Sequence, residues 1–161
     1  MKLRPLFRHR WRLFVSAAVL ALLALPTAPD AANPSPPDRV VGRWLTESGN
    51  LEVEIAPCGP ALCGTVVRVL ANRSMQNPNA EMKAADSRPA LGMVILRDFV
   101  PSGEDEWKGK IYNRENGKTY RCLMAPLSPT QLKIHGYVGL PLFGKTQVWR
   151  RVADSAAGTN Q

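Results

Sequence analysis

Histidine limits the chemistry that this 161-residue chain can perform. Its two histidines are His9 and His135, and His9 lies in an N-terminal segment that we expect to be removed. A Ser/His or Cys/His catalytic pair would therefore have to use His135. His135 alternates with Ile134 and Gly136, which favours an exposed residue of a strand. We therefore expect no histidine-based triad, no histidine-rich metal site and no enzyme activity.

The three cysteines indicate a structural disulfide rather than a reactive site. Cys58 and Cys63 flank a short turn, and this spacing suits a bridge across a hairpin in an oxidising compartment. Two free thiols are the alternative, while a metal site lacks further ligands. Cys122 is expected on the same face of a strand as Tyr120 and Met124 and is therefore expected to be a buried apolar thiol.

Acidic and glycine-containing motifs predict neither a metal nor a cofactor. Glu104-Asp105-Glu106 lacks the spaced oxygen ligands of calcium-binding loops, so we expect a solvated turn. Glu52 and Glu54 are expected on the solvent-facing side of a strand. No glycine-rich phosphate loop leads from a strand into a helix, which argues against a nucleotide site.

Aromatic residues are better candidates for a binding site. Seven of them fall in or beside strand-like runs: Trp44, Trp107, Tyr112, Tyr120, Tyr137, Phe143 and Trp149. Packing in the core is the ordinary role of such residues. Any that face an open cavity would line a site for an apolar or flat ligand.

Eight short strand-like segments would have to position these aromatic residues. The clearest is Leu51–Ile55, where apolar and acidic residues alternate with the period of a half-buried strand. The eight runs are Val41–Thr46, Leu51–Ile55, Leu62–Leu70, Leu91–Val100, Trp107–Asn113, Thr119–Ala125, Gln131–Val138 and Lys145–Val152. Turn residues, above all Asn116-Gly117, separate several of them. The pattern predicts an all-β fold, either an antiparallel up-and-down barrel or a sandwich, and barrel closure would remove exposed edges.

Residues 71–90 interrupt this succession of short strands and turns. The segment is polar, and so long a connection is often a lid or a binding loop. A solvated excursion without a role is the alternative. One helical turn is expected at Glu81–Ala85.

The N-terminal segment is typical of an export signal. Five basic residues precede the apolar run Leu13–Leu25, which as a helix spans ~20 Å and is too short for a bilayer core of ~30 Å. We expect a signal-peptide helix in residues 1–32, cleaved within 28–32, and a periplasmic or secreted protein. An uncleaved membrane anchor is the alternative. Residues 33–39 are expected to form a proline-rich spacer, 40–152 the barrel domain and 153–161 a flexible tail.

Charge gives little indication of a partner. The whole chain has 21 basic and 13 acidic residues, and removal of residues 1–32 leaves 16 and 12. This mild positive charge does not indicate nucleic acid binding, although it would favour anionic glycans, lipid headgroups or acidic proteins. Membrane contact is expected only through the signal peptide before cleavage.

Several motifs in order resemble the domain-of-unknown-function family 2147, a group of exported bacterial proteins. They are Gly42-x-Trp44, Cys58-Gly59-x-x-Leu62-Cys63-Gly64, Asn77-Pro78, Arg88-Pro89-x-x-Gly92, Trp107-x-Gly109-x-Ile111-Tyr112, Gly117-Lys118-Thr119-Tyr120-x-Cys122, Gly136-Tyr137-x-Gly139 and Thr146-Gln147-x-Trp149-x-Arg151. The resemblance covers Val40–Val152 and implies a lipocalin-like (calycin) eight-stranded barrel without an established activity. The chain departs from the family pattern in two places: Asn113-Arg114 stands where Asp-Pro is common, and Ser74-Met75-Gln76 lacks the acidic residue often found before Asn-Pro.

The likeness to lipocalins also implies roles for single residues. Trp44 would plug the barrel floor, and Arg151 would stack on it through a cation–π contact, with Arg150 as the alternative. We expect an exported, non-enzymatic protein that holds a small apolar ligand at the open end of the barrel. The candidate ligand-binding residues are Asn77, Arg88, Trp107 and Tyr112. The alternative function is a periplasmic protein–protein interaction or inhibitor module with a filled barrel and an envelope protein as its partner.

Overall fold

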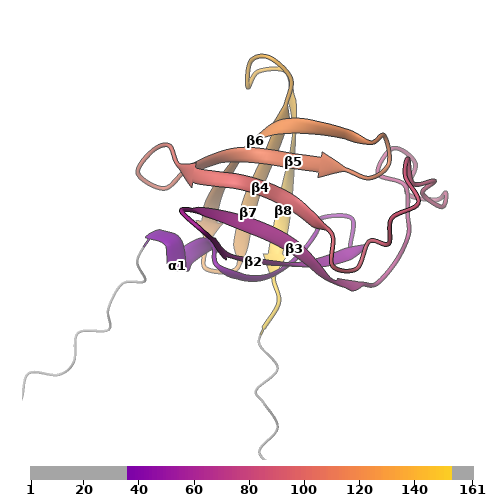
Figure 1. Ribbon diagram of the computed structural model, residues 1–161, viewed down its shortest axis with the longest axis horizontal. Coiled ribbons are helices and arrows are strands. Elements are labelled where there is room, and N and C mark those ends of the chain that lie inside the picture. Colours follow the sequence, from indigo (N-terminus) through magenta and orange to yellow (C-terminus); the bar gives the residue numbers. More distant parts are fainter. Residues whose placement is uncertain (1–35, 154–161) are drawn as a thin grey trace, which may run out of the picture. The chain divides into compact units, whose positions relative to one another are not determined.

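The computed structural model describes residues 36–153, which form a short helix and eight strands (Figure 1). The elements are α1 (Pro36–Val40), β1 (Gly42–Leu45), β2 (Leu51–Cys58), β3 (Ala61–Val69), β4 (Val94–Pro101), β5 (Trp107–Asn113), β6 (Lys118–Ser128), β7 (Gln131–Tyr137) and β8 (Gly144–Arg151). The expected signal peptide, residues 33–35 of the spacer and the tail from residue 154 lie outside the described residues. Within the described part, no helix is long and apolar enough to cross a bilayer.

The strands form a closed barrel in sequence order, with every neighbouring pair antiparallel. β1 and β8 close the ring through the pairs Trp44↔Arg151 and Leu45↔Arg150. The predicted eight-stranded antiparallel barrel is therefore confirmed, and each predicted run overlaps one strand. The spacer prediction missed α1, which begins at Pro36 because proline is well suited to the first turn of a helix.

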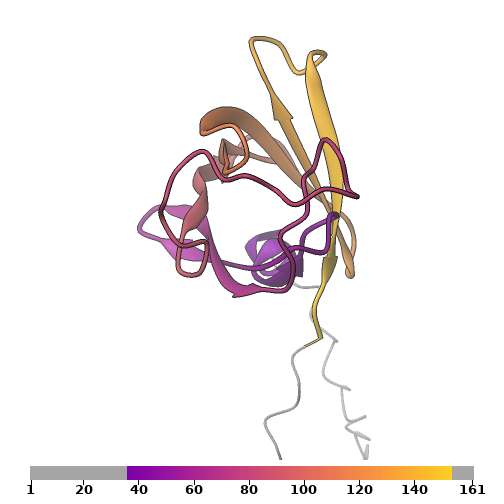
Figure 2. The same cartoon turned by 90° about the vertical axis from the view of Figure 1, so that its right-hand side faces the viewer.

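The barrel has a closed end and an open end. The closed end carries α1 and the connections 59–60, 102–106 and 129–130. The open end carries the connections 46–50, 70–93, 114–117 and 138–143. Figure 2 looks along the ring of strands from the open end, and α1 lies across the far end of the ring.

The closed end is held by Trp44 and Arg151. Trp44 is fully buried, and its Nε1 donates to the carbonyl of Val40 at 2.8 Å. The Arg151 Cζ lies 4.1 Å from the centroid of the Trp44 ring. The Arg151 guanidinium also donates to the carbonyls of Arg39, Val41 and Pro129 at 2.7–2.8 Å. One side chain of the last strand thus fastens α1, the first strand and the β6–β7 turn together.

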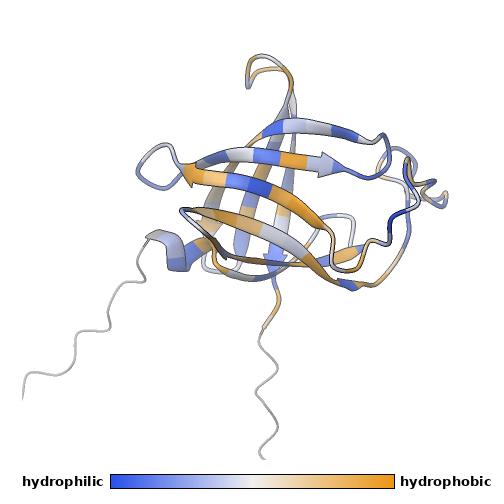
Figure 3. Ribbon diagram, viewed as in Figure 1, coloured by the Kyte–Doolittle hydropathy of each residue, from blue (hydrophilic) through white to orange (hydrophobic). Residues whose placement is uncertain are grey.

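Large side chains fill the closed half of the barrel because inward glycines make room for them. A Cβ on Gly64 would lie 2.7 Å from Cδ1 of Leu96, and one on Gly109 would lie 2.6 Å from Cδ2 of Phe99. The fully or nearly fully buried side chains of this half include Trp44, Val53, Ile55, Val66, Leu96, Phe99, Trp107, Cys122, Met124 and Leu132. Figure 3 shows hydrophobic and hydrophilic segments following one another along the strands, as expected when only one face of each strand packs on a core.

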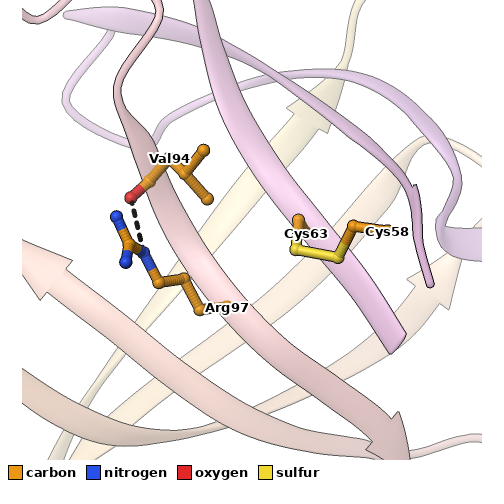
Figure 4. Close-up of a disulfide and its surroundings, with 4 residues drawn as sticks. All are labelled: Cys58, Cys63, Val94 and Arg97. Carbon is orange, nitrogen blue, oxygen red and sulfur yellow. Dashed lines mark hydrogen bonds between the residues drawn. A yellow bond between two sulfur atoms is a disulfide. The ribbon is translucent and has the colours of Figure 1, made fainter. Parts of the chain in front are cut away.

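Strand β4 pairs irregularly with its neighbour β5 in the barrel wall. Its pairing with β5 shifts register between Arg97 and Val100, and Asp98 adopts a φ of 59° there. The side chain of Arg97 turns back so that its Nε donates to the Val94 carbonyl at 3.3 Å (Figure 4). The bulge bends the strand and lets Phe99 enter the core.

The expectation that Glu52 faces solvent is wrong. Glu52 has only 6% of its surface exposed, although Glu54 is exposed as expected. The guanidinium groups of Arg43 and Arg68 lie 3.9 Å and 3.4 Å from its carboxylate oxygens. Glu52 is on the outer wall of the barrel, where the long side chains of the two arginines cover it. The alternation of apolar and acidic residues in the sequence does not reveal that neighbouring side chains cover an outward residue.

The predicted disulfide is confirmed. Cys58 and Cys63 are joined across the ends of β2 and β3 with a Cα–Cα distance of 5.8 Å (Figure 4). Cys122 is a free, buried thiol, and burial raises its pKa to about 12.

The helical turn expected at Glu81–Ala85 is absent, since Glu81 instead forms an isolated β-bridge with Arg73.

A thiol titration tests both cysteine assignments. Because the thiolate is the reactive form and Cys122 is buried with a raised pKa, the folded protein should react with no equivalent of a thiol reagent at mildly alkaline pH. Unfolding in guanidinium should expose one thiol, and prior reduction should expose all three. Three reactive thiols without reduction would contradict the disulfide.

The role of Arg151 is tested by comparison with its neighbour Arg150. Replacement Arg151→Met removes three hydrogen bonds to carbonyls and the contact with Trp44, so it should lower the free energy of unfolding by about 3 kcal/mol. Arg150→Met, at an exposed position, should change it by less than about 0.5 kcal/mol. Urea unfolding measures both, and equal effects would contradict the assignment.

Candidate functional site: a cavity at the open end of the barrel

The open half of the barrel contains a cavity of about 420 Å³. Ile95, Ile134 and Trp149 form part of its lining and come from β4, β7 and β8. Further apolar side chains from the barrel are Leu51, Val69, Ile111, Val138 and Phe143. The barrel is therefore filled at one end and hollow at the other.

Small inward residues explain why the open half is hollow. Gly136 of β7 lines the cavity, and a Cβ placed on it would lie 3.4 Å from Ile111, the nearest side chain. In the closed half, by contrast, a Cβ on Gly64 would meet Leu96 at 2.7 Å. Near Gly136 no bulky neighbour occupies the space that the missing side chain leaves.

The rim of the cavity is polar, and the charged side chains that line the cavity are basic. Among the described residues that line it, Arg114 and Lys145 are basic and none is acidic. The Arg114 Nη2 donates to the Arg88 carbonyl at 3.2 Å, while its Nε is buried without a hydrogen-bond partner among the described residues. The ammonium group of Lys145 has no ion pair within residues 36–153. The rim therefore offers two cations to an anionic group.

The connection 70–93 covers part of the mouth, and we call it the lid. Its first anchor is Asn50, which is 6% exposed. The Asn50 Nδ2 donates to the Arg73 carbonyl at 2.7 Å, and its Oδ1 accepts from the Arg73 N–H at 3.2 Å. The Arg73 guanidinium in turn donates to the Ser48 carbonyl at 3.0 Å. These bonds tie the lid to the connection between β1 and β2.

The second anchor of the lid lies on the connection between β5 and β6. The Glu115 carboxylate accepts a hydrogen bond from the Ser74 hydroxyl and another from the Met75 N–H, the latter at 3.0 Å. The Ala85 N–H donates to the Arg114 carbonyl at 2.8 Å. Met75 of the lid lines the cavity and contacts the Gln147 amide through its sulfur at 3.8 Å.

A third anchor joins Asp86 of the lid to β5. The Tyr112 hydroxyl donates to the Asp86 carboxylate, and the Arg88 Nη2 lies 2.6 Å from the same carboxylate. The Arg88 Cζ is 5.3 Å from the centroid of the Tyr112 ring. Arg88, and secondly Tyr112, hold the pKa of Asp86 well below its ordinary value, and Asp86 raises the pKa of Arg88. A depressed carboxyl pKa means that the anchor is present at neutral pH and is lost only in strong acid.

The four predicted ligand-binding residues do not gather at one place. Tyr112 lines the cavity. Arg88 contacts Tyr112 from the lid but does not line the cavity. Asn77 accepts a hydrogen bond from the Asn79 N–H at 3.2 Å within a turn of the lid. Trp107 is 3% exposed and pairs with Met124 at the closed end, so placing it at the open end is wrong.

The prediction for Trp107 failed because β5 runs from the closed end to the open end. Composition identifies a strand without giving its direction relative to the mouth. From the sequence we did not predict Asn50, Glu115, Arg114 and Lys145 as residues of the mouth. Asn50 and Glu115 lie between predicted strands, and the only signal for them was that alternate turns of an up-and-down barrel lie at the same end.

His135 makes structural contacts on the outer side of β7. Its Nε2 lies 2.7 Å from the Pro141 carbonyl, to which it donates, and its Nδ1 lies 2.8 Å from the Thr146 hydroxyl. Within residues 36–153, no group of three His, Cys, Asp or Glu side chains is placed to hold a metal ion.

Comparisons with known proteins agree with this architecture. The chain is similar to protein HP1028 from Helicobacter pylori, a solved structure described as belonging to the lipocalin family. The similarity has a TM-score of 0.54 and 23% identity, and it covers 71% of this chain and 83% of that one. A search of curated proteins finds no match. The sequence profile of DUF2147, described as an uncharacterized protein conserved in bacteria, matches residues 42–151. This chain therefore belongs to the DUF2147 family.

Proposed function

We propose that this protein is an exported, non-enzymatic binding protein that holds one small molecule with an apolar body and an anionic head group. The observation that carries the proposal is the cavity of about 420 Å³, whose described lining is largely apolar and includes two cations but no carboxylate. Ligand cavities of proteins typically have volumes of about 300–1,000 Å³ and are lined mainly by apolar side chains.

The apolar body of the ligand would occupy the depth of the cavity against Ile95, Ile134 and Trp149. These side chains offer no charge, so burial of hydrocarbon there is driven by removal of apolar surface from water. Met75 and Met82 of the lid would cover it from above, and their flexible thioethers adapt to different shapes.

The anionic head group would remain at the rim beside Lys145 and Arg114. Lys145 is exposed, so it needs no rearrangement to meet an anion. The unpartnered Nε of Arg114 supports the same position, because a buried donor without a partner costs free energy that an acceptor would recover. A carboxylate or a phosphate ester meets this description.

We also propose a periplasmic or secreted location. The Cys58–Cys63 disulfide supports an oxidising compartment, and the charged and apolar pattern of residues 1–32 supports export.

Matched twelve-carbon probes test the ligand class. Dodecanoate should bind more tightly than dodecanol, and dodecyltrimethylammonium should bind at least about tenfold more weakly than dodecanoate, because the rim cations repel it. Replacement Lys145→Glu should weaken dodecanoate binding by about tenfold and leave dodecanol binding unchanged. Isothermal titration calorimetry measures each affinity.

Lys133→Glu is the matched control, because Lys133 lies on β7 outside the cavity lining and the change in charge is the same. It should alter dodecanoate affinity by less than about twofold. Equal affinities for the anionic and cationic probes, or no binding of any probe, would contradict the proposal.

Loosening the lid should speed ligand exchange. Replacement Asp86→Asn removes the charge that holds Arg88 and Tyr112, so dodecanoate should dissociate about threefold faster or more in stopped-flow fluorescence. Glu54→Gln, on the outer wall, should leave the rate unchanged. An unchanged rate in Asp86→Asn would show that this anchor does not control the lid.

A further inference from the structure

The hairpin of β7 and β8 ends in an apolar tip, residues 138–143, that projects past the rest of the barrel in both views (Figures 1 and 2). Val138 and Leu140 each have 64% of their surface exposed, Leu142 has 85% and Phe143 has 65%. A cluster of four large apolar side chains in water is unfavourable, and such exposed patches commonly mark a contact surface.

The tip is held in this conformation by hydrogen bonds. The Phe143 N–H donates to the Leu140 carbonyl at 3.0 Å, and the Val138 N–H donates to the Phe143 carbonyl at 3.2 Å. The His135 Nε2 donates to the Pro141 carbonyl at 2.7 Å. Gly144 permits this contact, because a Cβ there would lie 2.6 Å from the same nitrogen. The tip is thus an ordered turn that presents its apolar side chains outward.

The strands that support the tip carry only positive charge. Residues 118–153, which contain β6, β7 and β8, include six basic residues and no acidic residue. Two of them lie close to the tip, since Lys145 pairs with Gly136 and Arg121 pairs with Tyr137. An apolar tip above a basic stem is complementary to a bilayer, whose hydrocarbon lies beneath a layer of charged headgroups.

We propose that the 138–143 tip docks this protein on the surface of an anionic phospholipid bilayer. Leu140 and Leu142 enter the boundary between headgroups and acyl chains, while Arg121 and Lys145 meet the phosphates. From the sequence we expected membrane contact only through the signal peptide, whereas the exposed tip provides a second surface for such contact. Val138 and Phe143 line the cavity as well as the tip, so docking brings the mouth of the barrel to the lipid.

Vesicle binding by paired variants tests this inference. The full chain is expressed in a bacterial host, and mass spectrometry defines the N-terminus of the purified product. Wild type and variants share that N-terminus, so any contribution of residues 1–35 is common to all. Vesicles of equal parts phosphatidylglycerol and phosphatidylcholine are compared with vesicles of phosphatidylcholine alone by flotation.

The wild type should bind the anionic vesicles, and its binding should weaken as salt is added. The double variant Leu140→Ser/Leu142→Ser should bind at least about tenfold more weakly, because two exposed apolar side chains are lost. The matched control is Leu127→Ser, which removes an exposed leucine near the closed end and should bind within about twofold of wild type.

Three results would overturn the inference. They are equal vesicle binding by the double variant and the wild type, no preference for anionic vesicles, and a dimer in light scattering that only the double variant disrupts. The last would identify a second copy of the chain as the occupant of the tip. Leu140 and Leu142 do not line the cavity, so the double variant should keep its affinity for dodecanoate. Failure of docking and failure of the proposed ligand site are therefore distinguishable.

Discussion

The contact of Arg151 with Trp44 seals one end of this barrel. β1 and β8 share only the pairs Trp44↔Arg151 and Leu45↔Arg150, so the ring depends on side chains at this seam. Arg151 adds three hydrogen bonds to carbonyls there, and the Glu47 carboxylate accepts from the Val148 N–H at 2.7 Å where β1 has already ended. With one end sealed in this way, any space that the ring encloses lies at the other end.

The geometry of the open end suits the proposed binding of a small molecule, because the lid covers part of the mouth of the cavity. The lid is fixed to Asn50 and Glu115, on two different connections of the barrel, and its own Asp86 binds Tyr112 of β5. All three anchors are hydrogen bonds or ion pairs between polar groups, and such contacts can open locally without disturbing the packed closed half. The hairpin tip shares Val138 and Phe143 with the cavity lining, so the mouth and the proposed docking surface are continuous.

The sequence predicted the strands, the closed barrel and the Cys58–Cys63 disulfide because these follow from local patterns and spacing. It did not predict the cover over Glu52, which depends on arginines from neighbouring strands. It placed Trp107 at the wrong end, because alternation gives the face of a strand and not its direction relative to the mouth. The cavity likewise depends on which inward positions have large neighbours, and Gly136 and Gly64 differ in that respect.

The central claim is that the open half of the barrel holds the ligand and the closed half remains packed. Methyl NMR of isoleucine tests it directly, because the chain has four isoleucines. Ile95, Ile111 and Ile134 line the cavity, whereas Ile55 is buried among the residues of the closed half. On titration with dodecanoate, the account predicts that the first three methyl signals shift and that the signal of Ile55 does not. Equal shifts of all four signals, or no shift of any, would contradict it.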